Sequence, residues 1–301
     1  MTVGTHDPAG SPALAEQAPI ATRRSWHVRA WRELRRAPLS AWFGLVVLAL
    51  YLIAALFAPV IAPYSETELV GPGYAPWSDQ FVLGTDQLGR DFLSRLIYGA
   101  RNTIGIAVLT TMLAFVIGGL LGLLAAVIGG WTDQLLGRAV DVLMAIPVLI
   151  FALVLLSIFG PGLVNLILIL AILDSTRVFR LTRAVAMNVV VLDFVEAAKL
   201  QGERLSWIMT REVLPNILPP LVAEFGLRFC FVFLTISALS FLGLGIQPPT
   251  ADWGSMVKEN AQLITFGDIT PLLPAAAIAL LTVAVNFIVD WFLHKTSGLR
   301  E

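Results

Sequence analysis

Residues 103–128 read TIGIAVLTTMLAFVIGGLLGLLAAVI, a run without one charged side chain. A helix needs about 20 residues to cross the hydrocarbon core of a bilayer, so this run is long enough to span a membrane. Its apolar residues fall on every face of a helix, as contact with lipid requires. They do not alternate with polar residues, as a β-barrel strand would. The run therefore predicts a membrane-spanning helix.

The composition of the whole chain agrees with this prediction. Of its 301 residues, 57% are apolar and 14% are charged, whereas a soluble domain has about 45–50% apolar and 25% charged residues. The net charge of -1 gives no basic field for nucleic acid. A single cysteine, Cys230, excludes an intrachain disulfide, and the three histidines lie outside the apolar runs, so we expect no metal site. A polytopic helical membrane protein is left.

Four other runs reach the same length, namely 39–61, 140–159, 217–239 and 272–293. A further apolar run, 163–173, is shorter and leads into the polar stretch Asp174-Ser175-Thr176-Arg177. We predict that it belongs to a span over about 163–181 with a polar inner end. The fold class predicted is therefore an all-α membrane protein with six transmembrane helices.

Lysine and arginine placement sets the orientation, because cytoplasmic loops carry an excess of both. With the N-terminus inside, fifteen of the 20 basic residues lie on the inner side and four on the outer side, while Arg228 lies within a span. Both termini are thus predicted to be cytoplasmic.

The same topology divides the chain into five parts. The predicted parts are a basic N-terminal tail (1–38) with a disordered beginning, a first span (39–61), an external loop with an amphipathic segment (62–102), a core domain (103–293) and a cytoplasmic C-terminal tail (294–301). The apolar run that follows the basic tail is too long for a removable signal, so we interpret it as a retained anchor.

The inner loop contains a segment, 193–216, that is a candidate docking site for another protein. Asp193 with Glu196 three residues later forms a capping-box pattern, which predicts a short helix. Gly202 permits a sharp turn, and Pro215 is expected to end a second short helix at Leu214. From these residues alone, a docking helix and a plain connector on the membrane surface remain equal alternatives.

Three separated motifs carry a family resemblance. The inner segment contains Glu196-Ala197-Ala198, Gly202, Ile208 and Leu214-Pro215-Asn216. This pattern resembles the EAA motif of binding-protein-dependent ABC importer permeases of type I. Two outer stretches, 83–95 (LGTDQLGRDFLSR) and 239–254 (LSFLGLGIQPPTADWG), resemble the second permease subunit of dipeptide, oligopeptide and nickel importers.

The resemblance implies a non-catalytic permease of the bacterial inner membrane. Its coupling helix would insert into a groove on an ATPase subunit, and ATP and Mg²⁺ would be bound by two such partner subunits. Further implied partners are a homologous second permease, an extracytoplasmic solute-binding protein and membrane lipid. Peptide is the solute expected first, with nickel and other small solutes as alternatives. The two outer loops would either receive the binding protein or hold the outer mouth closed.

The sequence itself contains no motor and no visible catalytic chemistry. None of the three lysines follows a glycine, so there is no phosphate-binding Gly-x-x-x-x-Gly-Lys loop. Neither a Gly-x-Ser-x-Gly nor a His-Glu-x-x-His pattern is present. The alternative function is a secondary transporter driven by an ion gradient, for which an intramembrane carboxylate such as Asp174 would be the main support.

Charged residues within the predicted spans each need a reason, because an ionised group at mid-bilayer costs about 2.5–3.5 kcal/mol. Glu224 and Arg228 have helical i, i+4 spacing, which predicts an ion pair, either as a bundle-facing bridge or as a contact in the translocation path. Asp174 could pair locally with Arg177, or it could meet a cationic group of a solute or a partner subunit.

Small and amide side chains predict helix packing rather than solute contact. Gly118 and Gly122 have the spacing that lets two helices approach closely. Asn165 and Asn286 are expected to form hydrogen bonds between helices.

Overall fold

The computed structural model describes residues 37–296, and side chains to residue 295. Its regular elements within this range are helices, which confirms the all-α prediction for the described residues. Two isolated antiparallel bridges, Leu69–Arg90 and Thr85–Asp91, fasten the loop that follows the first helix. Of the two predicted tails, residues 1–36 and 297–301 lie outside the described residues.

Twelve helical elements follow one another within the described range. They are α2 (Leu39–Ile61), α3 (Phe92–Ile128), α4 (Gly130–Met144), α5 (Val148–Phe159), α6 (Leu163–Val190), α7 (Asp193–Leu200), α8 (Leu205–Trp207), η1 (Ile208–Val213), α9 (Leu214–Leu242), α10 (Trp253–Asn260), η2 (Ala261–Phe266) and α11 (Leu272–Thr296).

Four of the predicted spans are confirmed as long apolar helices. α2, α3 and α11 have the length and hydropathy to cross a membrane, and α9 does so as part of the run Leu205–Leu242. α3 begins at Phe92 rather than at Thr103 because Asp91 caps it: one carboxylate oxygen accepts from the backbone N–H of Ser94 at 2.7 Å. The first turns of α3 therefore belong to the outer loops and not to the apolar run.

The predicted span over 140–159 is not one continuous helix. This region is divided between α4 and α5, which are bent by 86° at a short break. Pro147 explains the break, because a proline disfavours the α conformation in the preceding residue and has no N–H to continue the helix. Pro147 instead stands as the N-cap residue of α5.

The predicted span over 163–181 is the first part of a longer helix, α6. Some described helices are long and apolar enough to cross a membrane, judged by composition alone. α6 is not among them because it contains several charged residues. That set has four members, or five if the bent pair α4–α5 counts as one. The predicted number of six is thus confirmed for only four or five spans.

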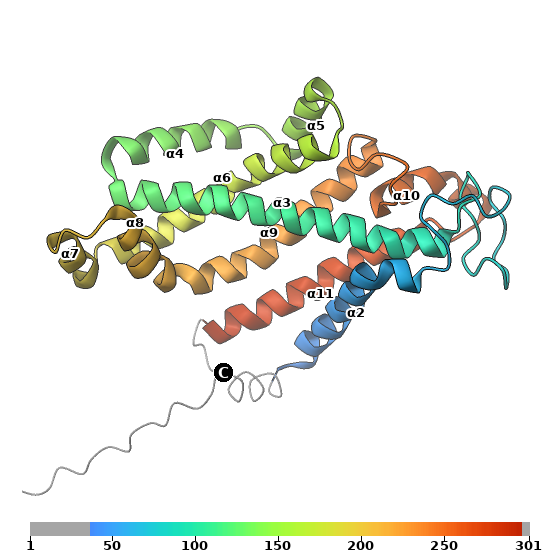
Figure 1. The fold of residues 1–301 in the computed structure, drawn as a ribbon, viewed down its shortest axis with the longest axis horizontal. Coiled ribbons are helices and arrows are strands. Elements are labelled where there is room, and N and C mark those ends of the chain that lie inside the picture. Colours follow the sequence, from blue (N-terminus) through green and yellow to red (C-terminus); the bar gives the residue numbers. More distant parts are fainter. Residues whose placement is uncertain (1–36, 297–301) are drawn as a thin grey trace, which may run out of the picture. The chain divides into compact units, whose positions relative to one another are not determined.

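Close packing of α3 on α6 forms the centre of the bundle (Figure 1). A Cβ atom built on Gly118 would overlap the carbonyl oxygen of Ser175 and would lie 2.8 Å from Cβ of Val178. A Cβ atom on Gly122 would lie 2.8 Å from both the carbonyl oxygen of Phe179 and Cβ of Thr182. The two glycines therefore pack α3 on α6 within this chain, as their spacing predicts.

The two outer loops and the inner segment lie at opposite ends of the bundle. In Figure 1, α10 and the loop before α3 lie at one end, and α7 lies at the other. α2 runs beside α11, and α9 connects the two ends. This arrangement agrees with the sides of the membrane that the sequence predicts for these segments.

Candidate functional site

The inner segment forms a compact helical knob, which consists of α7, the turn at Gly202, α8 and η1. Val195 and Ala198 are buried against Ile208, Met209 and Val213 in a small apolar cluster. Glu196 and Ala197 face outward and are exposed. Of the predicted coupling residues, Ala198 and Ile208 therefore stabilise the knob itself, while Glu196 and Ala197 present its surface.

Gly202 makes the predicted sharp turn after α7. Its φ of +78° lies in the left-handed region, which glycine adopts without the steric cost that other residues bear. The N–H of Gly202 donates to the carbonyl of Lys199, and the N–H of Glu203 donates to that of Ala198. A Cβ on Gly202 would meet no atom within 4 Å. The backbone angle, and not a lack of space, is therefore what this position requires.

Two details predicted for this segment are wrong. Asp193 is the first residue of α7 rather than its N-cap, which is Leu192, and no side chain caps the helix. Pro215 does not end a helix, because it lies in the first turn of α9, which continues the helical run from η1. Leu214 begins α9 directly after the π-helix η1. The knob is thus joined to α9 without an intervening loop.

The buried charges connect α6 to α9. Arg228 forms an ion pair with Glu224, with 2.7 Å between Nε and Oε1, which confirms the pair predicted within α9. Its Nη1 also lies 3.7 Å from Oδ1 of Asp174 on α6. Asp174 and Arg228 are both only 8% exposed. Of the alternatives for Asp174, the local ion pair with Arg177 is not found, since the acid pairs across to α9.

Arg177 lies at the edge of this charge cluster. Its guanidinium carbon is 6.0 Å from the ring centroid of Phe231, and that of Arg228 is 4.6 Å from the same ring. Farther along α6, Arg180 pairs with Asp141 and Arg183 with Asp133, both on α4. The sequence contained these charges, but no local spacing indicated that α4 would supply the partners.

The two outer motifs fold into one interlocked cap. Asp86 accepts from Nε of Arg90 at 2.6 Å and lies 3.3 Å from Nε of Arg95. Nη2 of the same two arginines lies 3.4 and 3.6 Å from Oε2 of Glu259 on α10. Side chains of Asp86, Arg90 and Arg95 are at most 4% exposed. The charged residues of the first motif therefore have a structural use, which sequence reasoning missed.

The second outer motif is locked to α3 by Asp252 and Trp253. Asp252 caps α10 by accepting from the N–H of Ser255 at 2.8 Å and also accepts from the hydroxyl of Thr103 at 2.9 Å. Burial raises the pKa of Asp252, and these donors oppose the rise. The indole N–H of Trp253 donates to the carbonyl of Leu96 at 2.9 Å. This geometry favours a rigid outer cap.

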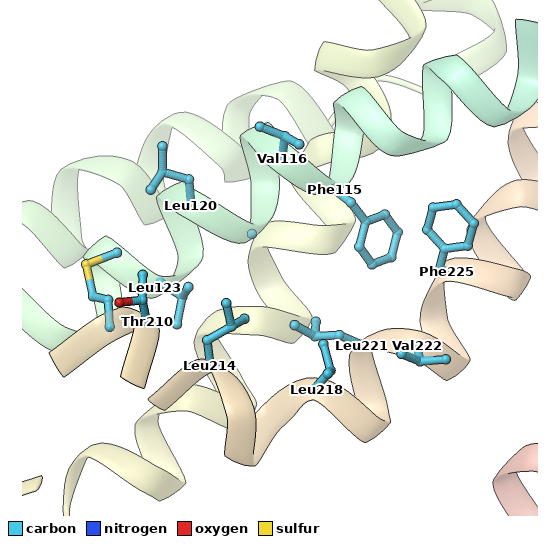
Figure 2. Close-up of a pocket in the computed structure, with 12 residues that line it drawn as sticks. Phe115, Val116, Leu120, Leu123, Thr210, Leu214, Leu218, Leu221, Val222 and Phe225 are labelled. Carbon is cyan, nitrogen blue, oxygen red and sulfur yellow. The ribbon is translucent and has the colours of Figure 1, made fainter. Parts of the chain in front are cut away.

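An apolar groove of about 510 Å³ lies between α3 and the start of α9. In Figure 2, Phe115 on α3 lies opposite Phe225 on α9, and Leu214 and Leu218 line the groove from α9. Thr210 supplies a hydroxyl at one end, and no charged residue lines the groove. Its chemistry suits hydrocarbon and not a polar solute. The polar groups that could meet such a solute lie instead around Asp174, Arg177 and Arg228.

Asn165 and Asn286 differ in whether their hydrogen bonds connect two helices. Asn165, in the first turn of α6, donates to the carbonyls of Phe159 and Gly160 at the end of α5, so its predicted helix-to-helix bond is confirmed. Asn286 donates to the carbonyl of Thr282 within its own helix, which makes the prediction wrong for this residue.

Comparisons with known proteins match this arrangement to one family. Residues 118–295 match the family described as binding-protein-dependent transport system inner membrane component. Residues 25–81 match the N-terminal TM domain of oligopeptide transport permease C. The first match includes the knob, the buried charges and the second outer motif.

Individual relatives cover nearly the whole chain. The di/tripeptide transport system permease protein DppC of Pseudomonas aeruginosa is 36% identical over 98% of this chain and 94% of its own length. A putative peptide permease of Brucella suis is 37% identical over 87% and 85%. The glutathione transport system permease protein GsiD of Escherichia coli is 34% identical over 94% and 91%.

A solved structure supports the fold. The crystal structure of an amino acid ABC transporter with histidines aligns with a TM-score of 0.51 and 19% identity, over 68% of this chain and 95% of that one. The family and its relatives favour an ABC importer over a secondary transporter. The chain belongs to the binding-protein-dependent transport system inner membrane components, the permease subunits of ABC importers.

Proposed function

We propose that this chain forms the translocation path of a peptide importer together with a second, homologous permease. Two ATPase subunits, which bind ATP and Mg²⁺, dock at the knob, and a solute-binding protein delivers peptide to the outer face. The family description names binding-protein-dependent transport. The relatives carry names for the transport of dipeptides, tripeptides and glutathione, which is the support for a peptide substrate.

The knob carries the proposal for coupling. It projects at one end of the bundle (Figure 1), and its exposed residues Ala197 and Leu200 offer a small and an apolar surface. Because η1 leads directly into α9, a push on α7 reaches the helix that holds Arg228. Nucleotide and solute would thus bias one shared two-state element, which is the requirement for allosteric coupling.

Six crossings follow if α6 and the bent pair α4–α5 each count as one. Arg228 pairs with Asp174 where α6 meets α9, and α3 covers α6 through Gly118 and Gly122. These contacts remove much of the cost of placing α6 in a bilayer. Six crossings put both termini on the same side of the membrane, and the distribution of Lys and Arg favours the cytoplasm as that side.

Reconstitution in proteoliposomes tests the coupling proposal. Ala197→Glu places a bulky charge on the exposed face of α7 without entering the apolar cluster beneath it. We expect at least a tenfold loss of ATP-dependent dipeptide uptake, together with loss of the ATPase subunits from the purified complex. Ala198 is unsuited to this test, because it is buried and its substitution would disturb the knob itself.

Val191→Glu is the matched control. Val191 is 76% exposed and lies just before α7, so the same charge is added outside the docking surface. Uptake should stay near the level of the unmodified protein. Normal uptake and normal ATPase association in Ala197→Glu would refute docking at α7. Uptake without nucleotide would refute the importer proposal as a whole.

A further inference from the structure

Arg177, near the middle of α6, forms no close ion pair among the described residues. Arg180 and Arg183 on the same helix both have carboxylate partners on α4. Arg177 has no such ion pair within residues 37–295, and its side chain is exposed. With a rise of about 1.5 Å per residue, it lies roughly 21 Å from the first residue of α6, which places it in the inner half of a hydrocarbon core about 30 Å thick that begins at that residue.

A small cavity of about 90 Å³ lies between Arg177 and the break that separates α4 from α5. Thr176 and Arg177 form its polar wall, and Ile146, Pro147 and Val148 form the wall opposite. This cavity has room for a small group such as a carboxylate and not for a whole peptide. The hydroxyl of Thr176 donates to the carbonyl of Leu173, so the guanidinium of Arg177 is the principal hydrogen-bond donor in the cavity.

The exposed guanidinium makes lipid an unfavourable neighbour for this face of α6. An arginine at mid-bilayer costs about 2.5–3.5 kcal/mol, and intramembrane charges accordingly face a cavity, a path or a partner. Interrupted helices near the bilayer midplane form binding sites in many transporters. Here an interrupted helix pair and an arginine that forms no close ion pair among the described residues border one cavity.

The nearby carboxylates both pair with Arg228 and form no ion pair with Arg177, although the charges of Asp174 and Arg177 attract each other. Glu224 lies 2.7 Å from Nε of Arg228, and Asp174 lies 3.7 Å from Nη1. Asp174 is therefore poorly placed to receive the amine of a solute, which was one alternative from the sequence. The group still available to an incoming solute is positive, and its natural ligand is a carboxylate.

We propose that Arg177 binds the free carboxylate of the transported solute at the break between α4 and α5. The inference rests on the proposed function, since it concerns the path of a peptide importer. An unmodified peptide carries such a carboxylate at its C-terminus, and a planar guanidinium can hold it through two parallel hydrogen bonds.

A charge-restoration experiment in the assembled transporter tests this site. Cys230 is the only cysteine in the chain, so Cys230→Ser gives a cysteine-free parent. Arg177→Cys in that parent should lower ATP-dependent uptake of a dipeptide at least tenfold. Reaction with a positively charged aminoethyl thiosulfonate reagent should recover much of the loss, and neutral or negatively charged reagents should recover none.

Arg180→Cys is the matched control, because Arg180 is also exposed and lies one turn along the same helix but pairs with Asp141. The solute probe is the dipeptide against its C-terminal amide, each delivered as preloaded binding protein. The parent should take up the free dipeptide at least tenfold faster than the amide. This preference should disappear in Arg177→Cys and persist in Arg180→Cys.

The outcomes separate this inference from the function on which it rests. If the cysteine-free parent shows no ATP-dependent uptake, the proposed function fails. If the parent transports but the thiol introduced by Arg177→Cys does not react with the aqueous reagents, a partner subunit or lipid covers the site and the inference is overturned. Recovery by the neutral reagent, or equal uptake of dipeptide and amide by the parent, overturns it as well.

Discussion

Adding one methyl group at Gly118 should loosen the bundle, while the same change at Gly119 should not. A Cβ at Gly118 would overlap the carbonyl oxygen of Ser175 and lie 2.8 Å from Cβ of Val178 on α6. A Cβ at Gly119 would meet no atom within 4 Å, because this residue lines the open groove of Figure 2. The two glycines are neighbours in α3, so they share membrane depth and helix.

The expected magnitude follows from two opposing terms. Glycine to alanine inside a helix stabilises by about 0.5–1 kcal/mol, and this gain applies to both variants. Overpacking of a close contact costs about 1–3 kcal/mol, and this cost applies only to Gly118→Ala. The helix term cancels in the comparison, so Gly118→Ala should be less stable than Gly119→Ala by about 1–3 kcal/mol. The unfolded fraction then differs by roughly fivefold to more than a hundredfold.

Unfolding of the purified chain in mixed micelles, followed by the loss of helix-helix contacts as denaturing detergent is added, measures this difference. Gly118→Ala should unfold at a lower detergent fraction than the unmodified protein, and Gly119→Ala at an equal or higher one. Equal midpoints for the two variants would refute the close contact between α3 and α6. Equal membrane insertion of both chains shows that the comparison concerns packing alone.

Two further changes test the charge cluster and the outer cap. Arg228→Met leaves Asp174 and Glu224 without their shared cation, which should destabilise the chain by about 3–5 kcal/mol. The double variant with Asp174→Asn should recover part of this stability in the same unfolding assay. No recovery would contradict the ion pair between α6 and α9. Trp253→Ala should lower the free energy of unfolding by about 3–5 kcal/mol, since Trp253 is 1% exposed and donates a hydrogen bond to α3. Faster proteolysis of residues 62–91 would show that the outer cap has loosened. Unchanged cleavage would contradict the rigidity of the cap.

The apolar runs and the motif order were readable from the sequence because they depend on local composition. The bounds of α2 agree with the prediction at both ends, since an apolar run of the right length forms a helix wherever lipid surrounds it. Gly202 was predictable for a similar reason: a turn with positive φ selects glycine through its own backbone.

The break at Pro147 is a feature that the local sequence pattern did not predict. Hydropathy alone joined 140–159 into one span, although Pro147 was visible in the run. Prolines also occur within α2 and α9 without ending those helices, so the residue type could not settle the matter. The direction of each helix after its proline depends on the helices that pack against it.

The sequence by itself determined that this chain is a helical membrane protein and which family it resembles, and it predicted which of its segments face each side. Hydropathy, basic-residue bias and motif spacing are properties of neighbouring residues, so they needed no fold. Only the tertiary structure decided that Arg228 pairs with Asp174 and that Arg177 is left without an ion pair among the described residues. Ion pairs between α6 and α9 depend on distances between residues far apart in the chain, and those distances exist only once the helices have packed.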